Sequence, residues 1–341
     1  MTDYKTIFGK NIRLQTSDLT MSTATEGELF YSATDNEFKV GVNLNAWSAG
    51  GNLNNDHANW ASSTASPQNA VVGVGGGPPG LLTEEYNGSA SANGENAPEK
   101  LEAHAGAGTL TAGLFFGGQV PASDTPGPAP QSQAETFEYD GTDYTDTGNM
   151  NTDRQSLSGC GTQTAGLGFG GRTISPSNDP GNINVNTEEY NGSSWTESGN
   201  LSTGRMQGSA FGIQTAAVYA QGRSMPGGAG SLNLTEEYNG STWSSGENFP
   251  EVRVYNSAAG ILTAGIIFAG KGGTFPGTTR TTTFTYDGTD YAASAAMGTG
   301  RYLGAGSGGT QGAALMAGGP PDQDATEEFG TTVTLKTVTD S

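Results

Sequence analysis

Four pairs of adjacent glutamates are the most obvious candidates for acid–base chemistry in this sequence. They stand at Glu84-Glu85, Glu188-Glu189, Glu236-Glu237 and Glu327-Glu328. Two carboxylates can divide the roles of general acid and general base, provided that both reach the same substrate. Adjacent side chains of a β-strand point to opposite faces, which separates them. We therefore expect these pairs to belong to the architecture of a repeated strand.

Basic residues recur with the same spacing, at Lys100, Arg154, Arg205, Arg253 and Arg301. We interpret them as partners for ion pairs or backbone carbonyls within or between the repeats, in preference to a ligand-binding ring.

The remaining candidates for metal or redox chemistry are two histidines and two Asp-Gly-Thr-Asp segments. His57 and His104 have no spacing that identifies a copper site with tyrosine ligands. Segments 140–143 and 287–290 carry oxygens that suit Ca²⁺, but Asp-Gly is also a hairpin-turn signal, because such turns need positive φ at the central residues. We expect no catalytic residues, no metal and no cofactor, and hence no enzyme.

All these residues belong to a repeat that occurs six times. Its clearest unit is a strand-like segment that ends in an aromatic residue, at positions 83–86, 136–139, 187–190, 235–238, 283–286 and 326–329. The final aromatics, at 86, 139, 190, 238, 286 and 329, are 43 to 53 residues apart. A period of this length is typical of one four-stranded propeller blade.

Four β-segments fill each period, and no apolar pattern of helical period persists. The first consists of very small side chains, the second is apolar and ends in glycine, and the third is the Glu-Glu-Tyr unit. The fourth follows an Asn-Gly or Asp-Gly turn and is marked by Tyr144, Trp195, Trp243 or Tyr291.

The sixth repeat lacks a fourth segment, and a matching segment lies near the N-terminus. Residues 45–53, with Trp47, match residues 193–201, with Trp195. We therefore predict an all-β fold, a six-bladed β-propeller whose last blade takes its outer strand from the N-terminal region, with Trp47 and Phe329 at the closure.

The repeat resembles kelch-like β-propellers, through Gly-Gly pairs at 117–118, 170–171 and 318–319 that are followed by a Tyr and then a Trp. The resemblance covers residues 41–330. Trp195 and Trp243 lie five residues after their tyrosines, closer than in the usual kelch unit, and several blades replace the Trp.

Residues 1–40 lie outside the repeat and form a predicted β-hairpin extension. Their sequence contains Gly-Glu-Leu-Phe-Tyr at 27–31 and Asp-Asn-Glu-Phe-Lys-Val at 35–40. This pattern resembles tailed-phage fibre and appendage proteins, and with degenerate kelch-like blades it is similar to virion proteins of marine phages, especially cyanophages. The resemblance implies a virion-attachment segment with Phe30, Tyr31 and Phe38 as contact residues. A hairpin cap on the propeller is the alternative.

Composition excludes several functional classes. The net charge of −20 disfavours nucleic-acid binding, which relies on clustered Lys and Arg. No apolar run reaches about 18 residues and no secretory signal follows Met1, so we expect no membrane insertion. We expect the single cysteine, Cys160, to be a small buried residue.

Long loops between the second and third segments indicate a binding face. They span 119–134, 172–186, 223–234 and 271–282, whereas the opposite face has short turns. Loops on a rigid scaffold often carry recognition, so this face supplies the candidate binding residues. These are Asp124, Gln131, Asn178, Asp179, Arg223 and Lys271.

The favoured function is that of a structural or adhesive virion protein of a tailed phage, a tail fibre or appendage component. In this prediction residues 1–40 attach to the particle, residues 41–330 form the displayed propeller, and residues 331–341 form a C-terminal tail. Its expected partners are other virion proteins and a host surface glycan or receptor. It is expected to be a homo-oligomer in the virion, assembled in the host cytoplasm. The alternative is a carbohydrate-binding or glycan-hydrolysing propeller outside a virion.

Overall fold

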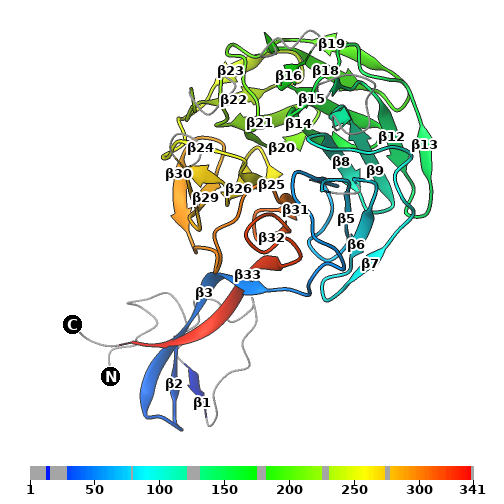
Figure 1. The fold of residues 1–341 in the computed structure, drawn as a ribbon. Coiled ribbons are helices and arrows are strands. Elements are labelled where there is room, and N and C mark those ends of the chain that lie inside the picture. The colour runs from blue at the N-terminus through cyan, green and yellow to red at the C-terminus, as the bar shows by residue number, and fades with distance from the viewer. Residues whose placement is uncertain are drawn as a thin grey trace. The chain divides into compact units, whose positions relative to one another are not determined.

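The structure is a computed structural model that describes residues 13–15, 29–77, 80–120, 131–174, 182–224, 230–272 and 277–338 (Figure 1). These residues form strands and turns, with no helix among them. The chain divides into two compact units, Trp47–Phe329 and residues 1–46 together with 330–341. No helix in the described ranges is long and apolar enough to cross a membrane.

The larger unit is built from antiparallel sheets, named here sheets 1 to 6 in chain order. Sheets 1 to 5 have four strands each, and sheet 6 is the part of a six-stranded sheet that excludes β1 and β2. Sheet 1 is β4 (Ala61–Ser62), β5 (Val71–Val74), β6 (Thr83–Tyr86) and β7 (Ser91–Asn93); sheet 2 is β8 (Ala105–Thr109), β9 (Ala112–Phe116), β12 (Thr136–Tyr139) and β13 (Tyr144–Asp146). Sheet 3 is β14 (Ser158–Thr162), β15 (Ala165–Phe169), β18 (Thr187–Tyr190) and β19 (Trp195–Ser198); sheet 4 is β20 (Ser209–Ile213), β21 (Ala216–Ala220), β22 (Thr235–Tyr238) and β23 (Trp243–Ser245). Sheet 5 is β25 (Ser257–Ile261), β26 (Ala264–Phe268), β29 (Thr283–Tyr286) and β30 (Tyr291–Ser294); sheet 6 combines β31 (Ala305–Thr310), β32 (Ala313–Ala317), β33 (Thr326–Thr337) and β3 (Glu37–Ala49).

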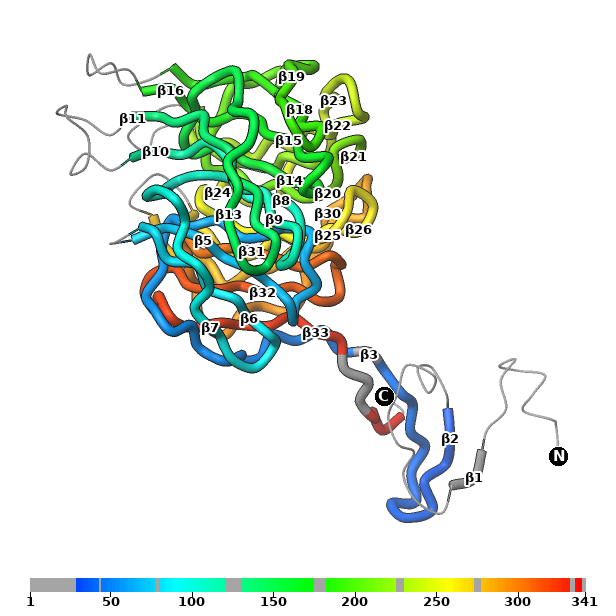
Figure 2. Tube along the Cα trace, turned by 90° about the vertical axis from the view of Figure 1, so that its right-hand side faces the viewer, coloured from blue at the N-terminus to red at the C-terminus, as the bar shows by residue number. Residues whose placement is uncertain are grey.

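The first strands of the sheets pack side by side in the order β4, β8, β14, β20, β25, β31. Figure 1 shows β8, β14, β20, β25 and β31 around the centre of the larger unit, and Figure 2 shows the unit from the side. β31 also lies beside β4. A Cβ on Gly106 of β8 would lie 2.3 Å from the carbonyl oxygen of Ser62 in β4. The very small residues of the first segments are therefore required by the close approach of these backbones.

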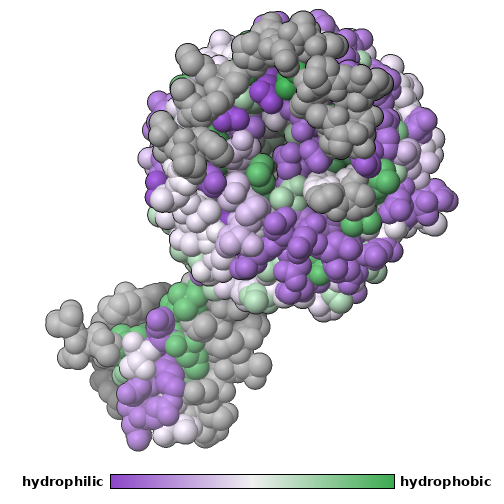
Figure 3. All heavy atoms as spheres, in the orientation of Figure 1, coloured by the Kyte–Doolittle hydropathy of each residue, from purple (hydrophilic) through white to green (hydrophobic). Residues whose placement is uncertain are grey.

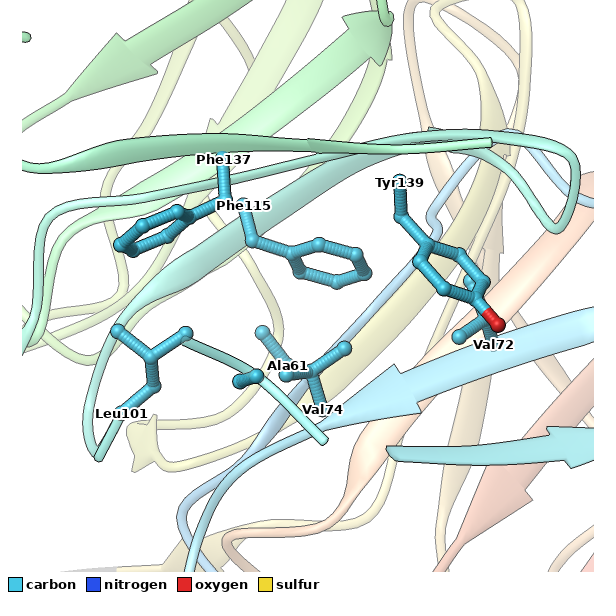
Figure 4. Packing of buried hydrophobic residues seen from close by; sticks show 8 residues of the cluster. Ala61, Val72, Val74, Leu101, Phe115, Phe137 and Tyr139 are labelled. Carbon is cyan, nitrogen blue, oxygen red and sulfur yellow. The ribbon is translucent and has the colours of Figure 1, made fainter. Parts of the chain in front are cut away.

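The hydrophobic core lies between consecutive sheets. In one cluster Val72 and Val74 of sheet 1 pack against Phe115, Phe137 and Tyr139 of sheet 2 (Figure 4). Equivalent clusters fill the other junctions and involve the apolar second strand and the aromatic end of the third.

The Asx-Gly turns between third and fourth strands differ from the expected geometry. In sheet 2, Tyr139 pairs with Tyr144, so the turn has four residues, and of these only Gly141 has positive φ (96°). Asp140 Oδ1 accepts the backbone N–H groups of Thr142 and Asp143, at 2.8 and 2.9 Å. The Asp is thus explained by an Asx turn, and the expectation of two positive φ values was wrong.

The N-terminal region supplies the strand that flanks β33 in sheet 6, where the sequence match places it. Trp47 Nε1 donates to Thr283 Oγ1 at 3.0 Å, as Trp195 Nε1 does to Thr136 Oγ1. The Trp47 ring packs against Phe329, with 5.3 Å between the ring centroids. Trp47 therefore makes the contacts that an outer-strand aromatic makes in other sheets.

The smaller unit is centred on a hairpin. β2 (Leu29–Ser32) pairs antiparallel with residues 37–40 of β3, and β1 (Arg13–Gln15) pairs parallel with β2. Phe30 is buried, Tyr31 contacts Phe38 edge-on with 5.2 Å between ring centroids, and Phe38 is 42% exposed. β33 continues to Thr337, and Val338 N–H donates to the Phe38 carbonyl at 2.8 Å. The described residues 331–338 thus belong to the compact unit that contains this hairpin.

We expect Trp47→Ala to lower the free energy of unfolding by about 3 kcal/mol, because the variant loses the packing of the ring and its hydrogen bond to Thr283. This value is at the lower end of the range for a large aromatic residue, since the ring is only half-buried. Urea denaturation gives the free energy of unfolding. Ile213→Ala, at an exposed position, is the control and should change it by less than about 0.5 kcal/mol. Equal stability of the two variants would contradict this role of Trp47.

Candidate functional site

The first glutamate of each Glu-Glu pair is buried against a basic residue of its own repeat. Glu188 accepts from Arg154 at 2.8 Å, and the Arg154 guanidinium also donates to the carbonyls of Gly170 and Asn186. The same pairing joins Glu84 to His57, Glu236 to Arg205 and Glu327 to Arg301. The predicted structural role of the recurring basic residues is confirmed at these positions.

The second glutamate faces the next sheet. Its carboxylate accepts the hydroxyl of the tyrosine that ends the third strand there. Glu138, at the same position of a repeat without a Glu-Glu pair, likewise accepts from Tyr190 at 2.7 Å. The other bonds of this kind are Tyr139–Glu85, Tyr238–Glu189, Tyr286–Glu237 and Tyr86–Glu328. Burial, with the bond to glutamate, raises the pKa of Tyr190 and Tyr238 to about 12. The two carboxylates of a pair thus have separate partners, which accounts for them without catalysis.

His57 and Glu84 form a fully buried pair. His57 Nε2 lies 3.2 Å from Glu84 Oε1, and its ring stacks on Trp60 at 4.3 Å between centroids. Burial would raise the pKa of Glu84, but hydrogen bonds from His57, Ser91 and two backbone or amide groups outweigh it and lower the pKa to about 2. Glu84 therefore stays charged at neutral pH.

Two further reactive residue types are buried in the larger unit. Burial lowers the pKa of His104 to about 3, and neither ring nitrogen has a hydrogen-bond partner among the described residues. Burial raises the pKa of Cys160 to about 12. At neutral pH the imidazole is uncharged and the thiol is protonated, which is a poor state for a nucleophile.

The predicted binding residues of the long loops divide into two groups. Asp124, Asn178 and Asp179 lie outside the described residues. Gln131 lies in β11 (Gln131–Ser132), which pairs with β10 (Gln119–Val120) at the base of the first long loop. The base of the second loop is formed by β16 (Arg172–Thr173) and β17 (Asn182–Ile183). The fourth begins in β27 (Lys271–Gly272), which pairs with β24 (Arg253–Val254) and β28 (Thr278–Thr279).

Arg223 and Lys271 lie at the starts of their loops and are both engaged with aromatic residues. The guanidinium carbon of Arg223 is 5.6 Å from the Tyr255 ring centroid, and Arg223 Nη2 donates to the Tyr255 hydroxyl at 3.2 Å. Lys271 Nζ lies 3.8 Å from the Tyr302 ring centroid.

Six backbone groups form a ring of hydrogen bonds at the centre of the same face. The residues precede the first strands and all have positive φ, from 52° to 65°: Asn59, Ala103, Ser156, Gln207, Tyr255 and Leu303. Each N–H donates to the carbonyl of the preceding member, and Asn59 N–H donates to Leu303 at 2.7 Å. The six bonds therefore return to their starting point.

A cavity of about 190 Å³ opens over this ring. The ring residues line it together with Gln119, Gln155, Arg172 and Arg223. Figure 3 looks onto this face, where hydrophilic residues surround a hollow at the centre of the larger unit. Polar side chains from several sheets, two of them arginines, converge at this cavity, and we take it as the candidate site.

The charge of the cavity is set by Arg172 and Arg223. Burial and the repulsion of Arg223 lower the pKa of Arg172, and Tyr255 partly opposes this. Among the described residues neither arginine forms an ion pair. The cavity therefore combines two unneutralised cations with amide and phenol groups.

Sequence reasoning identified Arg223 but missed Arg172, Gln155, Gln207 and Tyr255. Arg172 was visible only as the beginning of a loop. The signal that could have identified Arg172 is its position directly after a Gly-Gly pair, which makes it equivalent to Gln119 in the preceding repeat. The convergence of these side chains depends on contacts between repeats, which a single repeat does not reveal.

We expect Glu84→Gln to reduce stability at neutral pH. The folded pKa of Glu84, about 2, lies below its ordinary value of 4.5, so its charge stabilises the fold above pH 4.5 and this contribution disappears as the pH falls towards 2. The difference in free energy of unfolding between wild type and variant should therefore be largest near pH 7 and shrink below pH 4.5. Urea denaturation at several pH values measures it.

Glu95→Gln is the control for this pH series, because Glu95 is exposed. Its difference from wild type should stay near zero throughout. A Glu84→Gln difference that does not change between pH 7 and pH 2.5 would refute the role of the charged carboxylate.

Comparisons with known proteins support the fold and leave the function open. No family model matches the sequence, and no curated protein matches it. The solved structure of YjhT is similar to this chain with a TM-score of 0.66 at 12% sequence identity, over 83% of this chain and 99% of YjhT. At this identity the likeness concerns the fold alone.

Proposed function

We propose that this chain is a structural and adhesive protein of a tailed-phage virion, a tail fibre or appendage component. The observation that carries the proposal is the hairpin of β2 and β3, which bears the Gly-Glu-Leu-Phe-Tyr pattern of residues 27–31 and has Phe30 buried. Strand β33 returns to the same compact unit. Residues from both ends of the chain thus contribute to one unit, a suitable mount for a displayed domain.

The displayed domain in this proposal is a closed six-bladed β-propeller, with sheets 1 to 6 as its blades and β3 as the outer strand of the last. The six hydrogen bonds that return from Leu303 to Asn59 support it. So do the bond from Tyr86 in sheet 1 to Glu328 in sheet 6 and the likeness to YjhT. In such a ring the exposed sheet edges are short outer strands, such as β7 and β13 with three residues each, which limits unwanted pairing.

The long-loop face is the proposed recognition surface, directed at a host surface glycan or at another virion protein. Its loops begin and end in short ladders, such as β10 with β11 and β16 with β17. These ladders hold the loop ends in place, so the segments between them can vary in sequence at little cost to the sheets.

A carbohydrate-binding propeller outside a virion is the second candidate. The central cavity favours it, because several amides and a tyrosine converge there as they do in small-ligand sites. Co-purification with assembled particles would favour the virion protein, and turnover or capture of a glycan by the isolated chain would favour this alternative.

Removing residues 1–38 is expected to abolish incorporation into particles and to leave the larger unit folded, because the strand partners of that unit begin at Trp47. Incorporation is measured by immunoblotting of purified particles, and folding by the melting temperature of the isolated chain. The Trp47→Ala variant serves as a control for lost stability with the hairpin intact. Normal incorporation of the truncated chain would refute the attachment role.

Replacing residues 121–130 with a Gly-Ser linker of equal length tests the recognition surface. The ladder between β10 and β11 is kept, so the melting temperature should change little. We expect weaker adsorption of particles to host cells, with incorporation unchanged. If adsorption and incorporation both remain normal, this loop does not contribute to recognition.

A further inference from the structure

We propose that the central cavity of the long-loop face binds an oxyanion, a carboxylate or sulfate group of a small ligand, through Arg172 and Arg223. The inference rests on the cavity itself and holds whether or not the chain is part of a virion.

The repeat places both arginines at the same position of successive sheets. Each is the first residue of its long loop, and each forms a backbone bridge with the residue that precedes a ring member: Arg172 with Gln155, and Arg223 with Met206. Gln119 makes the equivalent bridge with Glu102. Equivalent backbone positions around one centre bring the two guanidinium groups to the same cavity.

These arginines differ from the structural ones in having no carboxylate partner among the described residues. Arg154, Arg205 and Arg301 each pair with a glutamate of their own repeat. Arg223, only 7% exposed, donates to a neutral phenol, and Arg172 donates to Gln155 Oε1 at 3.4 Å. Buried cations are costly without a counter-charge, and a guanidinium matches the two oxygens of a carboxylate or sulfate.

An unused donor beside the arginines also points to a ligand. Arg172 Nε, Arg223 Nε and Gln155 Nε2 have no hydrogen-bond partner among the described residues. The Gln155 side chain lines the cavity and is 2% exposed. The Nε groups of Arg154, Arg205 and Arg301 also lack a partner, so the donor that argues for a ligand is the buried Gln155 Nε2, which an oxyanion lone pair would satisfy.

None of the described residues that line the cavity carries a carboxylate. Glu102 Oε2 accepts from Gln119 Nε2 at 3.2 Å, and Glu102 does not line the cavity. The positive charge is therefore local, within a chain of net charge −20. That overall charge should slow the approach of anions at low salt, while the affinity depends on the two arginines.

Isothermal titration calorimetry with sulfate, acetate, glucuronate and glucose tests the proposal, at constant ionic strength set with NaCl. We expect heat of binding from at least one of the three anions and none from glucose. Binding of sulfate or acetate alone would indicate recognition of the free oxyanion, and tighter binding of glucuronate would indicate an oxyanion carried by a sugar. Both outcomes support the site.

The variants Arg172→Gln and Arg223→Gln should each weaken that binding roughly 10-fold or more, as expected for a lost charge-assisted hydrogen-bonded pair. Arg280→Gln is the matched control, since Arg280 starts no such loop, is paired with Glu251 and does not line the cavity. Its affinity should equal that of wild type.

Arg172→Lys and Arg223→Lys distinguish loss of binding from loss of folding. Each keeps the positive charge but lacks the planar guanidinium group that binds two oxygens at once. Their affinity should lie between those of wild type and the Gln variants, with melting temperatures close to wild type. Absence of anion binding by the wild-type chain, or equal affinity of the Arg172→Gln, Arg223→Gln and Arg280→Gln variants, would overturn the proposal.

Discussion

The ring of six backbone hydrogen bonds is the constraint on which the rest of the larger unit depends. Each member, such as Ser156, donates its N–H to one neighbour and offers its carbonyl to the next, which is possible because its φ is positive. The first strands that follow therefore start close together, and only small residues fit, as at Gly106. Side chains large enough to build a core must lie further out, between the sheets. This order explains why residue size increases from the first strand of each repeat to the third.

Polar links between sheets follow from the same geometry. The third strand of each repeat presents alternate side chains to opposite faces, so one glutamate meets a cation of its own repeat and the other meets the tyrosine of the next sheet. The substitutions in the repeat agree with this arrangement. Where Phe284 replaces the first glutamate, Arg253 pairs with Glu251 instead and lies 5.4 Å from the Phe284 ring centroid.

Much of this could be predicted from the sequence, because the repeat and the alternation of side chains are local properties. The strand order, the role of the glutamate pairs and the position of Trp47 beside β33 needed only comparison between repeats. The turn after Tyr139 was harder, since Asp140-Gly141 fits both two-residue and four-residue turns. The cavity could not be foreseen, because Arg172 and Tyr255 approach it from different sheets and only the ring geometry brings them together.

The junction between sheets 5 and 6 shows how the chain accommodates a missing link. Here Thr285 stands where other repeats have the second glutamate, and Phe329 stands where they have the tyrosine. A glutamate opposite Phe329 would lack its hydroxyl donor, and a tyrosine opposite Thr285 would lack its carboxylate, each at a desolvation cost of about 1–3 kcal/mol. Both positions of this junction therefore carry uncharged side chains, threonine at 285 and phenylalanine at 329. Trp47 packs on both Phe268 and Phe329 and donates to Thr283. Trp195 makes the equivalent contacts at a junction that also has its tyrosine–glutamate bond. The junction between sheets 5 and 6 thus relies on aromatic packing without the tyrosine–glutamate bond, whereas the junction between sheets 6 and 1 keeps that bond through Tyr86 and Glu328.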